Sequence, residues 1–223
     1  MIRKALFAMT PLLFAGFSAH ALPPAVHIDG IPHTIAIEPA SAGFMPSSQH
    51  APQGSRVLFS NENSKDQKGT FFCCSGFEIS GPLNATVGDM VWPAIAFTPG
   101  KSGFVTEIAA GIGYVEGRNR MTLGIWTDSN GLPGTEIAHD VVTVSQNFGE
   151  CCAFATFKGK VPVRAGTRYW VVAGTDTPDS DALLSWLYNS TNEVDAATEA
   201  YNFDGTWVSY SGVPAFNLVV YGK

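Results

Sequence analysis

The sequence is poor in charged residues, and the basic ones are the scarcer kind. Charged residues make up 14% of the chain, with 13 Lys and Arg against 19 Asp and Glu. Removing Arg3 and Lys4 with the leader described next leaves 11 basic residues against 19 acidic ones, a net charge of −8. Proteins that bind nucleic acids neutralise phosphates with Lys and Arg. We therefore expect no nucleic acid among its partners.

Long hydrophobic runs are absent after the first residues. Arg3 and Lys4 precede an apolar stretch from Ala5 to Phe17, and Ala19-His20-Ala21 follows as an A-x-A cleavage signal. This order is typical of a secretory signal peptide, so we expect residues 1–21 to be removed and the protein to be secreted or periplasmic. No later run approaches the roughly 20 apolar residues of a membrane-spanning helix. We expect the mature chain to be soluble, with no membrane span.

Catalytic signatures are also missing. The chain has no G-x-S-x-G, no H-E-x-x-H and no phosphate-binding glycine loop. His139 and Asp140 are neighbours in a strand-like run, so their side chains should lie on opposite faces and not act as a pair. A glycosidase needs two carboxylates across a cleft, which sequence spacing does not establish here. The glutamates concerned are Glu107, Glu116, Glu136 and Glu150.

Glycine and aromatic residues are abundant, with 23 Gly and 12% aromatics. From Arg56 onward the chain reads as twelve short β-like runs separated by turn residues, among them Met90 to Thr98 and Arg168 to Thr175. The only helical stripe, Asn192 to Tyr201, is short. This pattern predicts an all-β domain over residues 56–223, an antiparallel two-sheet β-sandwich of jelly-roll type. We expect the last run, Phe216 to Tyr221, to close a sheet beside an early strand such as Ala94 to Thr98.

Residues 22–55 form a Pro- and His-containing segment that we interpret as an N-terminal arm. Within it, Val26 to Ile37 could fold into a small hairpin across Asp29-Gly30, with Pro32 favouring an edge position.

The stretch from Met121 to Gly134, MTLGIWTDSNGLPG, joins a strand-like run to a dense turn signal. Residues 128–131 tolerate tight or left-handed backbone. Leu132-Pro133-Gly134 then suggests a connection longer than a two-residue hairpin, which could project from the sheet and carry contacts. Asp128 and Asn130 are therefore candidate ligand-binding residues.

Several segments carry a family resemblance: FCCSGFEISGP, AFTPGKSGFVTEIAAGI, WTDSNGLPGTEI, FGECC and AGTRYWVVAG. From about Val57 to the C-terminus the chain resembles an uncharacterised group of secreted bacterial β-sandwich domains. Some members of that group end in a PEP-CTERM-type sorting tail. This chain ends at Tyr221-Gly222-Lys223 without such a tail, so the resemblance does not imply surface anchoring. It implies a fold and assigns no chemistry to any residue.

The four cysteines occur as two adjacent pairs, Cys73-Cys74 and Cys151-Cys152. In an exported protein, disulfide bonds are the expected state. Cross-links between the pairs are favoured over two vicinal bonds, because vicinal bonds close strained eight-membered rings. Three pairings remain open: Cys73–Cys152 with Cys74–Cys151, Cys73–Cys151 with Cys74–Cys152, and the two vicinal bonds. A zinc site bound by all four thiolates suits the pattern less well, because adjacent cysteines lack the C-x₂₋₄-C spacing of zinc ligands.

The five tryptophans could supply a platform for stacking on sugar rings. Trp126 and Trp170 lie in runs whose alternation could place them in the core, where indole is usually buried. Trp186 and Trp207 lie nearer to turns and are the candidate ligand-binding tryptophans.

An acidic loop, DTPDSD, contains Asp176, Asp179 and Asp181. A calcium ion could organise these carboxylates with backbone carbonyls, although the loop does not follow the EF-hand pattern. The alternative is a simply solvated loop.

These features favour a secreted, non-catalytic binding or structural module, with glycan or another extracellular polymer as the ligand class. A secreted hydrolase of unrecognised type is the alternative.

Overall fold

The computed structural model describes residues 27–28, 31–32, 34–36, 53–61, 71–144, 153–189, 199–209 and 215–223. Within these ranges the regular elements are all strands. The described part of the chain also contains no helix long and apolar enough to cross a membrane. The strands are β1 (His27–Ile28), β2 (Ile31–Pro32), β3 (Thr34–Ala36), β4 (Arg56–Ser60), β5 (Phe71–Ser80), β6 (Val91–Phe97), β7 (Gly103–Ala110), β8 (Ile112–Glu116), β9 (Arg120–Ser129), β10 (Leu132–Thr143), β11 (Ala153–Val163), β12 (Tyr169–Thr175), β13 (Leu183–Asn189), β14 (Glu199–Phe203), β15 (Thr206–Ser209) and β16 (Leu218–Gly222).

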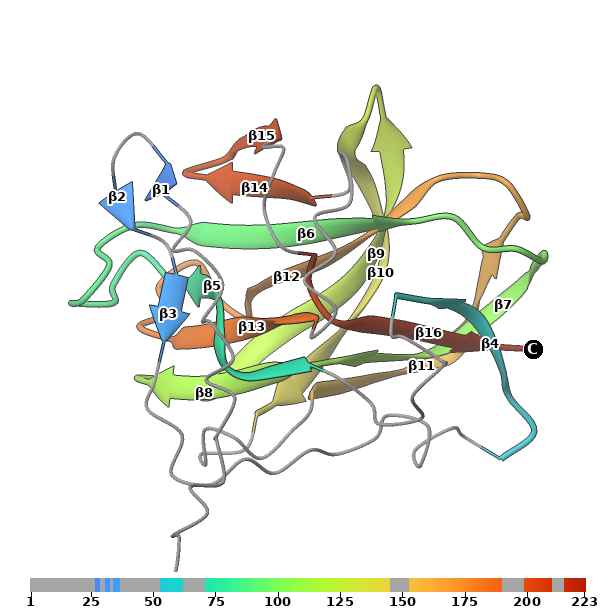
Figure 1. The fold of residues 1–223 in the computed structure, drawn as a ribbon, viewed down its shortest axis with the longest axis horizontal. Coiled ribbons are helices and arrows are strands. Elements are labelled where there is room, and N and C mark those ends of the chain that lie inside the picture. Colours follow the sequence, from blue (N-terminus) through green and yellow to red (C-terminus); the bar gives the residue numbers. More distant parts are fainter. Residues whose placement is uncertain are drawn as a thin grey trace, which may run out of the picture.

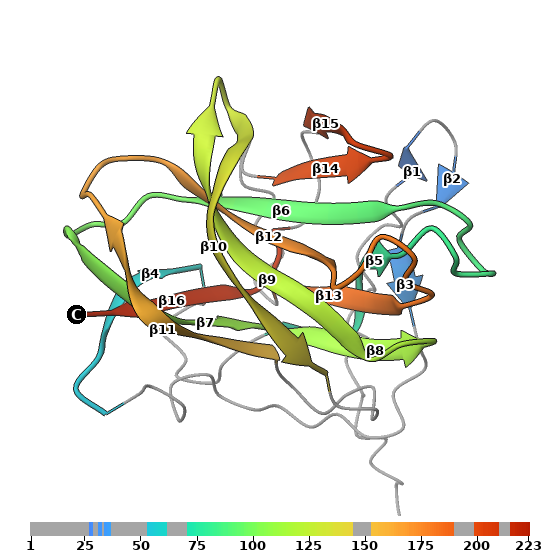
Figure 2. The same ribbon diagram turned by 180° about the vertical axis from the view of Figure 1, so that it is seen from behind.

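The strands form two layers (Figures 1 and 2). One layer has the order β10-β9-β12-β6-β14-β15, and all its pairings are antiparallel. The other contains β11-β7-β16-β4 together with β3-β5-β13-β8. A bridge between Tyr188 and Phe216 joins these two groups of strands. Ser80 of β5 also pairs with Val91 of β6, so the second of these groups is hydrogen-bonded to the first layer at one point. The predicted fold class, an antiparallel two-sheet β-sandwich, is confirmed.

A single hydrophobic core fills the space between the layers. Phe77 on β5 meets Tyr201 on β14 with ring centroids 4.2 Å apart, and Phe59 on β4 meets Phe97 on β6 at 5.9 Å. Strand alternation explains which residues point inward. On β12, for example, Val171 belongs to this core, whereas its neighbours do not.

Trp186 lies in this core and is fully buried. Its ring stacks on Phe216 with centroids 4.9 Å apart, and its Nε1 donates a 2.9 Å hydrogen bond to the carbonyl of Asn217. A ring enclosed in this way has no face open to a ligand. The structure therefore removes Trp186 from the candidate ligand-binding residues.

The N-terminal segment contributes strands of its own. β1 and β2 pair as the predicted small hairpin, with Ile28 opposite Ile31. β3 pairs with β5, placing Thr34 opposite Phe77. The segment interpreted as an arm thus adds a strand to the sandwich.

The last strand, β16, lies between β4 and β7, with Val220 opposite both Phe59 and Ile108. It closes a sheet beside an early strand, as expected. The suggested partner, Ala94 to Thr98, is wrong, because β6 lies in the other layer between β12 and β14. The helical interpretation of Asn192 to Tyr201 is also wrong at residues 199–201, which belong to β14, and residues 192–198 lie outside the described ranges.

The β9–β10 hairpin is tighter than predicted. Ser129 pairs with Leu132, leaving a two-residue turn of Asn130 and Gly131 with φ of 55° and 84°. Two positive φ values define a type I′ turn, which matches the twist of the flanking strands. The expected longer connection is wrong because Leu132 and Pro133 already belong to β10, where they pair with Ser129 and Asp128 of β9. The tip of the hairpin still projects from the sheet (yellow-green, Figure 1).

The cysteine pairing stays a prediction. Cys73 and Cys74 belong to β5, but their side chains and the whole of Cys151-Cys152 lie outside the described structure. The predicted signal peptide, residues 1–21, also lies outside it and stays a prediction.

Candidate functional site

Tryptophans and small residues cover the outer face of the layer β10-β9-β12-β6-β14-β15. Strand alternation and register place Trp170 and Val172 on this face, opposite Ala96 and Ala94 of β6 on one side and Trp126 and Gly124 of β9 on the other. Small side chains leave room for large rings above the sheet. Four of the five tryptophans gather on this face: Trp92, Trp126, Trp170 and Trp207.

Part of this face forms a second, smaller core. Trp170 is 1% exposed although it points away from the main core, because Trp126, Leu132 and Trp207 pack over it. The rings of Trp126 and Trp207 meet edge to face. Trp207, a candidate from the sequence, is therefore a half-buried packing residue beside the open part of the face.

Asp128, another candidate from the sequence, holds the hairpin tip in place. Its Oδ1 accepts a 2.9 Å hydrogen bond from Nε1 of Trp170, and its Oδ2 accepts one of 3.2 Å from the backbone N–H of Gly131. Both carboxylate oxygens thus have partners within the protein. Asn130 supplies the left-handed turn position beside them. The structure therefore accounts for Asp128 and Asn130 as residues that form and hold the turn.

A pocket of about 340 Å³ opens next to this small core. Its lining includes Gly124, whose lack of a side chain leaves space above the sheet, Val172, and the rings of Trp92 and Trp126. The polar residues of the lining are Thr122, Glu136, His139, Thr175, Asp176 and Thr177. Such a volume lies at the lower end of the range for small-molecule sites, which combine apolar surface with a few placed polar groups.

The ring of Trp92 is held by two contacts. A Cβ atom placed on Gly174 would lie only 2.9 Å from Cδ2 of Trp92, so the indole rests directly on the glycine backbone. Its Nε1 donates a 3.3 Å hydrogen bond to Oγ1 of Thr175. Neither contact uses the exposed part of the ring, so Trp92 is positioned without a ligand.

Glu136 and His139 form a hydrogen-bonded pair at the pocket, with Oε1 2.6 Å from Nδ1. In a regular strand, residues three apart point to opposite faces. Here a β-bulge intervenes, because Glu136 pairs with Trp126 and Ala138 with the very next residue, Ile125. The extra residue, Ile137, brings Glu136 and His139 to the same face.

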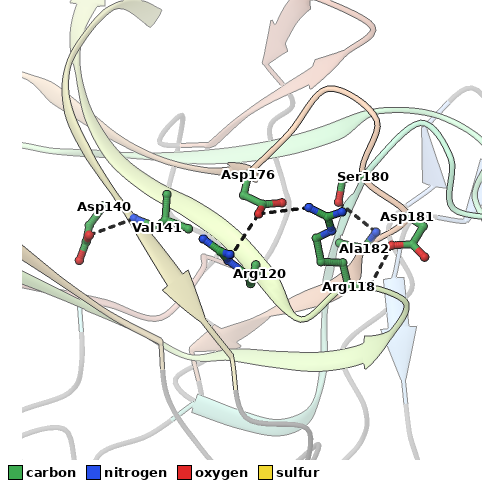
Figure 3. Close-up of polar contacts among 8 residues, drawn as sticks. All are labelled: Arg118, Arg120, Asp140, Val141, Asp176, Ser180, Asp181 and Ala182. Atoms are coloured by element: carbon green, nitrogen blue, oxygen red, sulfur yellow. Dashed lines mark hydrogen bonds and ion pairs between the residues drawn. The ribbon is translucent and has the colours of Figure 1, made fainter.

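Asp176 also lines the pocket and lies between two arginine side chains (Figure 3). Its side chain is 5% exposed, and its Oδ2 lies 3.5 Å from Nε of Arg120 and 3.6 Å from Nη1 of Arg118. Its Oδ1 has no hydrogen-bond donor among the described residues. Arg118 donates its backbone N–H to Oδ1 of Asp181 over 3.0 Å.

The three aspartates predicted as a calcium loop do not converge. Asp176 faces two guanidinium groups, Asp181 accepts a backbone hydrogen bond, and Asp179 is exposed. Among the described residues, no three His, Cys, Asp or Glu side chains come together as metal ligands.

Sequence reasoning did not assign Trp92, Trp126, Glu136 or His139 to the site. The available signal was the pattern of small residues at every second position in Trp92-x-Ala94-x-Ala96, which indicates an outward face able to hold rings. The Glu136–His139 pair had no such signal, because the bulge depends on the pairing with β9.

No protein-family model and no curated protein matches the chain. Among solved structures, it is similar to the crystal structure of the cysteine protease and lectin-like domains of Cwp84, a surface layer associated protein of Clostridium difficile. The TM-score is 0.42 and the sequence identity 11%. The match covers 60% of this chain and 32% of the other, so this chain spans about a third of that one. A likeness this distant carries no functional argument.

Proposed function

We propose that this protein is a secreted, non-catalytic module that binds a glycan in the pocket between Trp92 and Trp126. The observation that carries the proposal is the pairing of two partly exposed indole rings with hydroxyl and carboxylate groups in one cavity. A sugar ring has an apolar face that can lie on an indole and a rim of hydroxyls that need hydrogen-bond partners. The pocket offers both kinds of contact.

The construction of the pocket supports recognition of a ligand without large rearrangement. Most of its lining comes from β6, β9, β10 and β12, which are hydrogen-bonded to one another in one layer, and Asp176, Thr177 and Pro178 directly follow β12. Sites built on strands hold their side chains more precisely than sites on loops. A preorganised pocket loses less entropy when it binds.

Export is part of the proposal and is supported by the signal-peptide pattern in residues 1–21. A secreted sandwich with a glycan pocket would meet polysaccharides outside the cytoplasm. The extracellular polymer remains the proposed ligand class.

The direct test is a pull-down of the mature protein, residues 22–223, on a panel of insoluble polysaccharides, followed by calorimetric titration with soluble oligomers. Trp92→Ala and Trp126→Ala should each weaken binding at least about tenfold, as expected for an aromatic at the centre of a binding site. Phe104→Ala is the matched control, because Phe104 is an exposed aromatic on β7, outside the pocket lining. Equal affinities of the two tryptophan variants and the Phe104→Ala control would contradict the proposal.

The same samples separate the hydrolase alternative, which the Glu136–His139 pair favours because a hydrogen-bonded carboxylate and imidazole can act as an acid–base couple. A binding module leaves the polymer intact. Release of reducing ends that stops in the His139→Ala variant would instead establish an enzyme.

A further inference from the structure

The charged groups of the pocket are unevenly distributed. Its lining contains two carboxylates, Glu136 and Asp176, and no Lys or Arg. His139 is the basic residue of the lining, and it already contacts Glu136. A ligand that enters therefore meets acceptors and negative charge rather than basic side chains.

Asp176, a residue of the pocket lining, has a buried acceptor without a donor among the described residues. Its side chain is 95% buried, being 5% exposed, and Oδ1 has no donor among the described residues. The distances from Oδ2 to Arg118 and Arg120 exceed the usual 2.7–3.2 Å of an N–H···O hydrogen bond. Both arginine side chains are largely open to solvent, at 43% and 53% exposed, so their charges are screened. Oδ1 of the carboxylate therefore keeps its capacity to accept, while Oδ2 faces the two guanidinium groups.

Glu136 can also accept further hydrogen bonds. Its Oε1 contacts His139, whereas a carboxylate offers about four acceptor positions on two oxygens. The side chain is 42% exposed, so a ligand in the pocket can reach it.

The two indoles complete the pattern. An ammonium group over the face of a tryptophan is attracted by the quadrupole of the ring, and tryptophan is the best residue for this contact. Trp92 and Trp126 line the same cavity as the two carboxylates. Rings and carboxylates together favour a cation, and neither favours an anion.

From this geometry we propose that the ligand is an amino sugar polymer whose amines are free and protonated. The inference rests on the glycan-binding function proposed above. The sugar ring lies against an indole, and its ammonium donates to Asp176 and Glu136. The net charge of −6 of the whole chain adds a long-range attraction for a polycation.

The test compares two polymers of equal length, poly-glucosamine with free amines and its N-acetylated form, at a pH where the amine is protonated. The mature protein should bind the free-amine polymer at least about tenfold more tightly, and the preference should shrink as salt is added. Asp176→Asn and Glu136→Gln should bring the two affinities together. The control is Glu116→Gln, which makes an equal change of charge on β8 in the other layer. It should keep the preference for the free-amine polymer.

Two outcomes overturn the inference and are distinguishable. Equal or tighter binding of the N-acetylated polymer that still depends on Trp92 leaves glycan binding in place and refutes the amine. Binding of neither form, and of no other polysaccharide of the panel, refutes the proposed function itself and the inference with it.

Discussion

The rings of Trp126 on β9 and Trp207 on β15 lie edge to face with centroids 6.0 Å apart, although three strands separate β9 from β15 in the layer. In a flat sheet, four strand spacings would put them about 19 Å apart. The layer must therefore curve until its two hairpins meet, and β10 indeed contacts β15. This curvature buries Trp170 and leaves the pocket open beside it.

Replacing Trp186 should affect stability rather than binding. We expect Trp186→Ala to lower the free energy of unfolding by about 3–5 kcal/mol, because it leaves a large cavity and removes the contact with Phe216. Urea denaturation measures this directly. A loss below about 1 kcal/mol would show that the ring is not part of the core.

Asp128→Ala should destabilise the hairpin tip. The change leaves the indole N–H of the buried Trp170 without its acceptor, which costs about 1–3 kcal/mol. Asp179→Ala is the control: this exposed aspartate lies outside the contacts described above, and its removal should change stability by less than about 0.5 kcal/mol. Similar urea midpoints for the two variants would argue against the structural role of Asp128.

Gly131→Ala should also be destabilising. Gly131 has a φ of 84°, and an L-residue in the left-handed region costs roughly 1–2 kcal/mol. Gly100→Ala provides the comparison, because a Cβ there would meet no atom within 4 Å and its backbone is not left-handed. Thermal unfolding should rank Gly131→Ala clearly below Gly100→Ala, and the reverse order would rule out the type I′ turn.

Glu116 makes a pH-dependent contribution to stability. Hydrogen bonds from Oγ1 of Thr86 and from Nδ2 of Asn84 hold the pKa of this carboxyl below its ordinary value of 4.5. Because the folded state favours the charged form, the contribution is present above the ordinary pKa and is lost as the pH falls through the lowered one. Glu116→Gln should therefore be less stable than the wild type near neutral pH, and the gap should narrow well below pH 4.5. Urea denaturation at both pH values checks this, and a gap that does not change with pH would contradict it.

Local patterns in the sequence predicted the strands well. The run Met90 to Thr98 became β6, and Arg168 to Thr175 became β12, because alternation and β-branched residues act over a few positions. The two-residue turn was missed because the turn-like residues Leu132-Pro133-Gly134 follow it. Two of them, Leu132 and Pro133, in fact pair with β9.

The candidate site was harder to predict because it depends on distant segments. Trp186 appeared close to a turn, but Phe216, thirty positions away, covers its ring. The pocket draws on four strands and on a bulge set by cross-strand register. Neither burial from a distant segment nor register can be read from one stretch of chain.

The most direct test of the central claim is a tryptophan fluorescence titration of the mature protein with soluble oligomers of the polysaccharide that it retains. If the ligand lies on Trp92 and Trp126, emission should change saturably, and the change should disappear in the Trp92→Phe/Trp126→Phe double variant while unfolding stays cooperative. An unchanged titration in that variant would place the ligand elsewhere and contradict the account.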